Sequence, residues 1–215
     1  MRIRDECLLT AGSSSQPVQD GLVFWLDGQD TTLTDRVQGD TLTVDRPLGG
    51  VGYSNADGFW RIYGTEQYSR SMKWISALGY AGVRCVEFLG GFGADTSSIG
   101  CCDSKFLWDR GPKLTFRDIE WWGINVQAGQ IWHLVAQIDD NGLPVIYADG
   151  SLRKTGTKSV SPLSGSTILS LTTLQTSTHT PRAQVGCIRL YDRPLTQAQI
   201  EQNLAYEIDL GRITV

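Results

Sequence analysis

The sequence lacks any long run of apolar residues. A membrane-spanning helix needs about 20 consecutive apolar residues, so no membrane partner is expected. The first residues, MRIRDE, are charged at Arg2, Arg4, Asp5 and Glu6, and no apolar stretch of the length of a secretion signal follows them. The sequence therefore predicts a protein made in the cytoplasm without a signal peptide.

The five cysteines also lack a recognisable pattern, because none of them forms a C-x-x-C pair: Cys7, Cys85, Cys101, Cys102 and Cys187. An odd set with these spacings fits neither a disulfide framework nor a zinc site. We expect reduced, structural thiols. The adjacent thiols have a redox alternative, but Lys105 is their one cationic neighbour in the sequence, so positions in a loop or at a sheet edge are the simpler interpretation.

Catalytic motifs are equally scarce. The chain has only two histidines, His133 and His179, and no H-E-x-x-H or Gly-x-Ser-x-Gly motif accompanies either. Structural roles are therefore favoured for both. No cofactor is predicted.

What the chain does contain is the composition of one globular domain. It has 215 residues, of which 40% are hydrophobic and 20% charged, together with 24 glycines. This length suits a single β-sandwich or barrel. The net charge of −4 argues against a nucleic-acid partner, which requires an excess of Lys and Arg.

Short apolar or alternating runs recur along the chain, separated by Gly, Asp, Asn and Ser; examples are GLVFWLD, GFWRIY, VRCVEFLGGF, IEWWGINV, IWHLVAQID, PVIYAD and QVGCIRLY. Such spacing is typical of an all-β sandwich or barrel. The turn sequences DDNG and ADG predict two hairpins, over roughly 131–148 and 145–156. The Ser-rich stretch AGSSSQP predicts a flexible link, which divides the chain into an arm over 1–17 and a domain over 18–215.

The last of these runs ends in a predicted helix. Pro194 prevents continuation of a strand beyond Asp192, and Thr196 followed three residues later by Gln199 forms a capping-box pattern. Gly211 occupies the position expected of a C-terminal cap.

The helix is expected to be apolar on one side. Ile200, Leu204 and Ile208 fall on one stripe, while Gln197 and Glu201 face away. The helix is therefore predicted to cover one face of the sandwich.

Three segments together resemble the concanavalin A-like, laminin-G-like jelly-roll domains: GLVFWLDGQD, IWHLVAQIDDNGLPVIYADGSLRKTG and GCIRLYDRPLTQAQIEQNLAYE. The resemblance covers roughly residues 20–212 and implies a two-sheet antiparallel jelly-roll sandwich with a C-terminal capping helix. It also implies that ligands meet the concave face or the rim loops. Similar domains occur on bacterial surface proteins, carbohydrate-active enzymes and bacteriophage virion proteins, so the fold does not fix a ligand.

Some relatives are laminarinase-type glycosidases, in which the resemblance implies carboxylates in an E-x-D-x-x-E run. The nearest match is RDIEWWGIN, where Asp118 and Glu120 share one face of a strand. Phe116 and Trp121 occupy the positions where the pattern requires glutamates. The sequence therefore predicts no enzymatic activity.

A glycan-binding surface is predicted instead from strand alternation. Trp122, Ile124 and Val126 are expected in the core, which leaves Trp121 outside as a stacking platform for a sugar ring. The alternative is that Trp121 lies under a loop or a neighbouring subunit. The candidate carbohydrate-binding residues are Trp121, Asn125, His133, Gln137, Trp60 and Tyr63. Calcium occurs at the rim of some relatives, and Asp27, Asp30 and Asp149 are candidate ligands, but no loop of calcium-binding spacing supports a metal site.

These observations predict a non-enzymatic binding or structural module of a bacteriophage or prophage virion: a capsid decoration, fibre or tail-associated protein that contacts host glycans. Its expected partners are other virion proteins, a second copy of the chain, and host cell-surface glycans. Its expected location is the virion or an extracellular surface. The alternatives are a bacterial lectin-like polysaccharide-binding protein and a laminarinase-type glycosidase.

Overall fold

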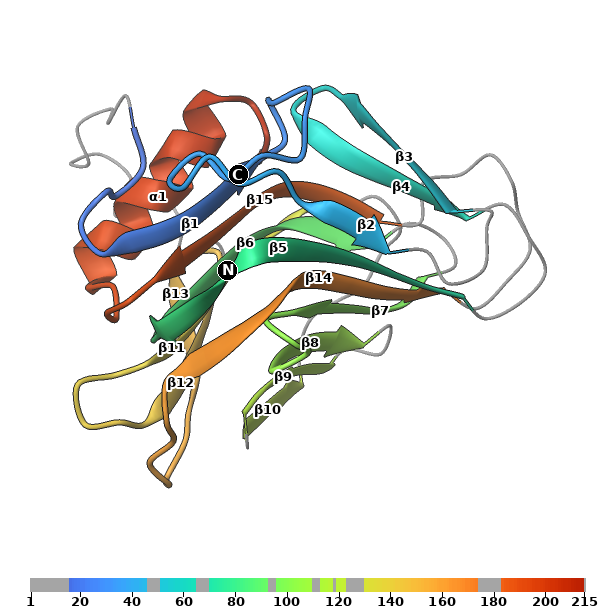
Figure 1. Ribbon diagram of the computed structural model, residues 1–215. Helices are drawn as coiled ribbons and strands as arrows, with labels where there is room; N and C mark the ends of the chain where they lie inside the picture. Colours follow the sequence, from blue (N-terminus) through green and yellow to red (C-terminus); the bar gives the residue numbers. More distant parts are fainter. Residues whose placement is uncertain are drawn as a thin grey trace.

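The computed structural model describes residues 16–45, 51–64, 70–92, 96–109, 113–117, 119–122, 130–173 and 183–214. These residues form two antiparallel sheets that pack face to face, and a helix lies beside one of them (Figure 1). The predicted all-β, two-sheet sandwich with a C-terminal helix is confirmed.

One sheet has eight strands, in the order β13-β12-β11-β6-β15-β4-β3, with β1 paired to β15. Their bounds are β13 (Ser151–Thr155), β12 (Pro144–Ala148), β11 (Trp132–Ile138), β6 (Cys85–Phe92), β15 (Ala183–Tyr191), β4 (Phe59–Gly64), β3 (Val51–Ala56) and β1 (Leu22–Asp27). The β11–β12 and β12–β13 pairs confirm both predicted hairpins.

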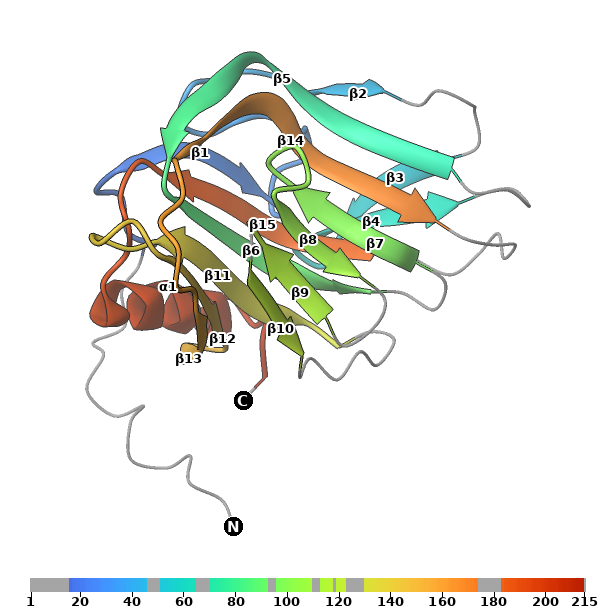
Figure 2. The same ribbon diagram turned by 90° about the horizontal axis from the view of Figure 1, so that it is seen from below.

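The other sheet has seven strands, in the order β10-β9-β8-β7-β14-β5-β2, which Figure 2 shows side by side. Their bounds are β10 (Ile119–Trp122), β9 (Lys113–Phe116), β8 (Phe106–Asp109), β7 (Thr96–Cys101), β14 (Leu163–Thr173), β5 (Arg70–Val83) and β2 (Thr43–Asp45).

Strand β5 was not predicted because its pattern is interrupted. Its pairing with β14 contains three register shifts, and Gly79 and Gly82 adopt φ values of +68° and +69°. These irregularities break the alternation of apolar and polar residues from which a strand is identified.

The core lies between the sheets and is rich in aromatic rings. Trp60 of β4 and Trp74 of β5 meet edge to face with their centroids 6.4 Å apart, and Phe88 of β6 lies 5.9 Å from Phe106 of β8. These cross-sheet pairs bury large apolar surfaces in preferred ring geometries.

Helix α1 (Gln197–Asp209) begins and ends as predicted. Thr196 Oγ1 accepts from Gln199 N at 3.3 Å, and Gln199 Oε1 accepts from Thr196 N at 2.9 Å, which completes the capping box. Gly211 has φ +71°, and the amides of Gly211 and Arg212 donate to the carbonyls of Ile208 and Glu207. This is the Schellman pattern that positive φ at the capping glycine permits.

The predicted apolar stripe of the helix is only partly right. Ile200 is buried, but Leu204 and Ile208 are only half-buried. The fully buried positions one and two turns further on are Asn203 and Glu207, with 0% exposure each. The buried face of the helix therefore combines Ile200 and Tyr206 with two polar residues, Asn203 and Glu207, which bond to polar groups on the sheet.

The described part of the chain has four cysteines, all buried and unpaired: Cys85, Cys101, Cys102 and Cys187. Burial raises the pKa of each of these thiols, so they stay protonated and unreactive. Cys7 lies outside the described residues.

Residues 1–15 of the predicted arm are also outside the described residues. The segment that precedes β1 is attached to the sandwich at Val18, whose buried amide donates to Asn203 Oδ1 of α1 at 2.7 Å. Among the described residues, no helix has the length and apolar character required to cross a membrane.

Candidate functional site

Polar side chains gather in two places: a buried network between α1 and the eight-stranded sheet, and the outer face of the seven-stranded sheet. The buried network is closed to solvent at its inner end, whereas the outer face is open, so only the outer face can meet a ligand.

The buried network is a series of carboxylates and cations in alternation. At its inner end, Glu87 Oε1 of β6 accepts from His133 Nε2 of β11 and from Arg189 Nη1 of β15, each at 2.8 Å. Arg189 also pairs with Glu207 of α1. These four side chains have 0% exposure.

The series continues to the surface through the residue that follows the helix cap. Arg212 Nε lies 2.7 Å from Glu207 Oε2, and its Nη1 lies 2.8 Å from Asp27 Oδ1 of β1. Arg36 then pairs with Asp27 at 3.1 Å and with Asp30 at 2.8 Å. Every charge in the series thus has an opposite charge beside it, which is what makes burial of ions tolerable.

Neutral groups complete the network around Glu87. Tyr191 Oη donates to Glu87 Oε2 at 3.1 Å, and Asn203 Nδ2 of α1 donates to the same oxygen at 2.8 Å. Burial alone raises the pKa of the Glu87 carboxyl, but Arg189, then His133 and Tyr191, outweigh it and lower that pKa to about 2. Glu87 is therefore a carboxylate at neutral pH.

This network fixes the helix rather than binding a ligand, because its inner groups are fully enclosed. The three sequence segments that carry the family resemblance meet here: Asp27 comes from the first, His133 from the second, and Arg189 and Tyr191 from the third. Sequence reasoning assigned no role to Glu87, Asn203 or Glu207. For Glu87, the available signal was a charged residue inside an apolar strand run.

Two predicted glycan-binding residues lie at this interface, so their prediction as surface residues is wrong. His133 is fully buried against Glu87. Gln137 is 3% exposed and makes two hydrogen bonds with the Leu195 backbone, at 3.0 and 2.8 Å. The predicted alternation in β11 is correct, but α1 and the segment leading to it cover that face.

Trp60 is also wrongly predicted as a surface residue. It is 2% exposed and lies between the sheets. The side chain of Tyr63, as well as Asn125 and Asp118, lies outside the described residues.

The orientation of the two adjacent tryptophans is the reverse of the prediction. Trp121 is half-buried against the core, with the Arg153 guanidinium of β13 lying 5.6 Å from its ring. Trp122 is 62% exposed on the other face of β10. Since Ile119 is buried, alternation from that residue points Trp121 inward and Trp122 outward.

Trp122 belongs to an aromatic and charged group at one end of the outer face. Lys113 Nζ of β9 lies 5.4 Å from the Trp122 ring and 3.2 Å from Glu120 Oε1. The cation therefore lies close to both the indole and the carboxylate, which restrains the ring while leaving much of it in contact with solvent.

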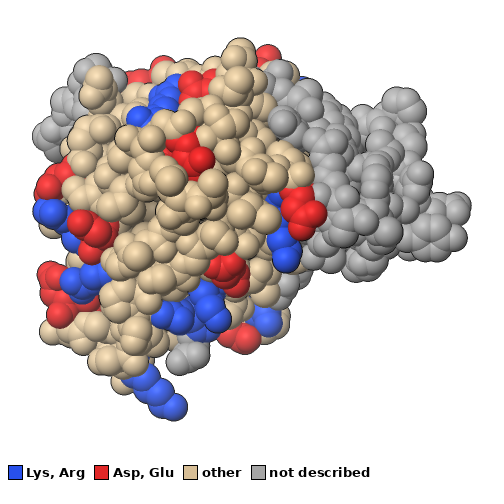
Figure 3. Space-filling model, viewed as in Figure 1, with Lys and Arg blue, Asp and Glu red and all other residues tan. Residues whose placement is uncertain are grey.

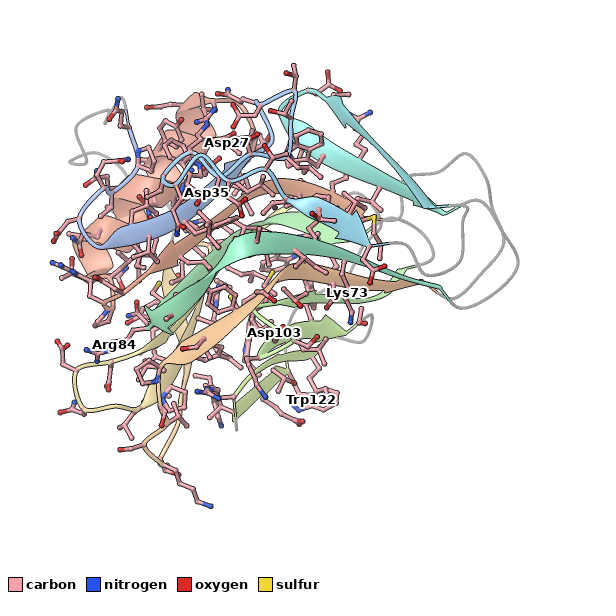
Figure 4. All side chains as sticks on the ribbon, viewed as in Figure 1. Asp27, Asp35, Lys73, Arg84, Asp103 and Trp122 are labelled. Atoms are coloured by element: carbon pink, nitrogen blue, oxygen red, sulfur yellow. The ribbon has the colours of Figure 1, made fainter. Side chains whose placement is uncertain are left out.

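A continuous row of paired residues crosses the outer face from this group. Glu120 pairs with Thr115, which pairs with Leu107 and then Gly100; Gly100 pairs with Ser170, which pairs with Lys73 and then Asp45. Figure 4 shows Lys73 and Trp122 on the side of the molecule away from α1.

A second polar group lies further along this row, at the β7–β8 turn. Ser104 Oγ and Ser170 Oγ are 3.0 Å apart over Gly100, where a Cβ would lie 2.8 and 2.6 Å from these hydroxyls. Tyr80 Oη donates to Asp103 Oδ2 at 2.8 Å. Cys102, Asp103 and Ser104 all have positive φ, between +53° and +61°.

The aspartates considered for calcium have other partners. Asp27 and Asp30 pair with arginines, and Asp149 Oδ1 accepts from His133 N at 3.2 Å. Within the described ranges, no three His, Cys, Asp or Glu side chains are placed to hold a metal ion.

No protein-family model and no curated protein sequence matches the chain. Several solved structures do match in fold. Domain 4 of AbnA, a GH43 extracellular arabinanase from Geobacillus stearothermophilus, aligns with a TM-score of 0.57 and 17% identity, covering 86% of this chain and 98% of that domain.

Trypanosoma rangeli sialidase aligns with a TM-score of 0.57 and 14% identity, covering 88% of this chain and 33% of the sialidase. Botulinum neurotoxin type C aligns with a TM-score of 0.56 and 12% identity, covering 87% of this chain and 51% of that structure. The chain thus spans about a third of the sialidase and about half of the toxin chain. It has a β-sandwich fold of the kind found in these proteins, compatible with a lectin-like jelly roll.

Proposed function

We propose that the protein is a glycan-binding module and that the outer face of the seven-stranded sheet binds the glycan. The observation that carries the proposal is the exposed Trp122 beside the Lys113–Glu120 pair. A sugar ring presents an apolar C–H face that stacks on an indole and hydroxyl edges that exchange hydrogen bonds with charged neighbours. This group offers both kinds of contact on one open strand pair.

Three structures of similar fold support the proposal. The AbnA domain is in complex with arabinotriose, the Trypanosoma sialidase is in complex with sialic acid, and botulinum neurotoxin type C depends on two ganglioside molecules for cell entry. These sugars differ from one another, so they support a class of ligand and leave the sugar of this chain open.

The proposed module binds without hydrolysing. A glycosidase requires a general acid and a second carboxylate that flank the same bond. Glu120 Oε1 is already bound by the Lys113 ammonium at 3.2 Å. A search for released reducing ends from bound polysaccharide tests this point, and a release that disappears in Glu120→Gln protein would establish the glycosidase alternative.

The finer proposal is that the module is part of a bacteriophage or prophage virion. Its support is the resemblance of three sequence segments to domains of virion proteins. Mass spectrometry of purified particles from the source tests it, and absence of the protein from those particles would contradict it. Such absence together with glycan binding favours the bacterial lectin-like alternative.

A glycan array with the full chain tests the binding function. We expect binding that falls about fivefold or more in the Trp122→Ala variant, since loss of one aromatic platform removes on the order of 1–3 kcal/mol. Leu152→Ala is the matched control, because Leu152 is 57% exposed on β13 of the other sheet. A silent array, or equal loss in both variants, would refute the proposed site.

A further inference from the structure

We propose that the polar group at the β7–β8 turn is a second subsite of the same face, so that the protein binds the interior of an extended, uncharged glycan chain. This group consists of Asp103, Ser104, Ser170 and Lys73. The inference rests on the proposed function and adds to it the length and the charge of the ligand.

The strand order sets the distance between the two subsites. Trp122 lies on β10 and Lys73 on β5, and the order β10-β9-β8-β7-β14-β5 places five strand spacings between these strands. At about 4.8 Å per spacing, the two ends are about 24 Å apart across the sheet. That distance exceeds a single sugar and suits a short oligosaccharide.

The surface between the two subsites carries few protruding side chains. The row runs through Thr115, Leu107 and Gly100, which are short or half-buried. Gly100 carries no side chain, and the two serine hydroxyls occupy the space that its Cβ would need. A glycan chain that lies along this row therefore meets only short or half-buried side chains before it reaches Ser104 and Ser170.

The second subsite offers both donors and acceptors of hydrogen bonds. A sugar hydroxyl both donates and accepts, and so do the hydroxyls of Ser104 and Ser170. The Asp103 carboxylate accepts and the Lys73 ammonium donates. Lys73 is exposed and has no ion pair among the side chains that the structure describes. Its donors are available to a ligand.

The β7–β8 turn is preorganised. Its three successive non-glycine residues with positive φ are strained, so the surrounding contacts must hold them. The amides of Cys102 and Asp103 donate to Ile168 O and Thr167 O at 3.2 and 3.0 Å, and Tyr80 holds the Asp103 carboxylate. The turn is therefore fixed before any ligand arrives, which lowers the entropy lost on binding.

Charge selects among possible chains. Among the described residues that strand pairing places along this row, the charges balance: Lys73 and Lys113 against Asp45 and Glu120. Figure 3 shows Lys and Arg interspersed with Asp and Glu on the side of the molecule seen in Figure 1 as well. A balanced surface gives a polyanionic chain no electrostatic advantage, so a neutral chain is the better fit.

The test is calorimetric titration of the full chain with arabino- and cello-oligosaccharides, from monosaccharide to hexasaccharide, and with oligogalacturonates. We expect affinity to rise with length for a neutral series. Lys73→Ala should weaken hexasaccharide binding about tenfold, the value of one charge-assisted hydrogen bond, and leave disaccharide binding unchanged. Trp122→Ala should weaken both.

Lys154→Ala is the control, because this exposed lysine lies on β13 of the other sheet. Asp103→Asn is a second variant that keeps the acceptor for Tyr80 and tolerates positive φ; it should also weaken the hexasaccharide selectively. Binding that is independent of length, or unchanged in both variants, would overturn the second subsite while leaving the proposed function intact. Preference for oligogalacturonates would overturn the assignment of a neutral chain.

Discussion

Asn203 of α1 joins three parts of the fold through one amide: its Nδ2 donates to Glu87 Oε2 of β6 at 2.8 Å, and its Oδ1 accepts from Val18 N at 2.7 Å. Because the residue is fully buried, each lost bond leaves an unpaired group in the interior. Polar contacts thus attach the helix to the sheet, beside the apolar contacts of Ile200.

Arg189→Met should destabilise the domain by about 3–5 kcal/mol, because it leaves Glu87 and Glu207 without their shared cation in the interior. Urea denaturation of the purified chain measures the difference. Arg193→Met is the control: its pairs with Asp20 and Asp192 are about half exposed, and such pairs contribute at most about 1 kcal/mol. Equal midpoints for the two variants would show that the buried pair does not hold the domain.

The stability of the domain should fall with acid in a defined window. The pKa of Glu87 is lowered to about 2 in the folded state from 4.5, so its contribution is complete above pH 4.5 and is lost as the pH falls toward 2. The facing groups are His133 of β11, Arg189 and Tyr191 of β15, and Asn203 of α1. In Glu87→Gln protein, we expect lower stability at pH 7 and a flatter dependence between pH 4.5 and 2. An equally steep dependence in the variant would assign the acid sensitivity to other carboxyls.

Ending the chain after Asp192 should destabilise the whole domain. The truncation removes Asn203, Glu207 and Arg212, and it uncovers the apolar surface that Ile200 protects. Since a marginal domain has only about 5–15 kcal/mol of stability, loss of these contacts rivals the total. Thermal melting followed by circular dichroism measures it. A truncated protein that melts like the full chain would contradict the role given to α1.

Deletion of residues 1–15 should leave the melting temperature unchanged, because this segment carries only Ile3, Leu8 and Leu9 as sizeable aliphatic residues. The deletion retains Val18, which is buried and bonded to Asn203. The same protein should lose incorporation into particles or oligomers if the segment orders on a neighbouring subunit. A lower melting temperature would show that the segment belongs to the fold, and retained incorporation would contradict a role in assembly.

Much of the architecture was predictable because its signals are local. The capping box at Thr196 and Gln199 and the glycine at Gly211 fixed both ends of α1, since these residues act on the backbone of the same turn. The two hairpins around β12 followed from their turn residues for the same reason. Strand β5 was not predicted, because its irregular backbone at Gly79 and Gly82 is set by its pairing with β14 and not by its own sequence pattern.

The candidate site depended on information that the sequence does not carry locally. Alternation in EWWGINV separates Trp121 from Trp122, but the choice of inner face required the buried Ile119 as a reference. Alternation in β11 placed His133 and Gln137 correctly opposite Leu134, yet only the packed helix shows that their face is closed. The sequence by itself determined regular strands such as β1, β6, β11, β12 and β15, the hairpin turns and the ends of the helix, because those are set by short-range sterics and hydrogen bonds. The tertiary structure decided which faces are covered and where charges are buried, because burial depends on segments that lie far apart along the chain.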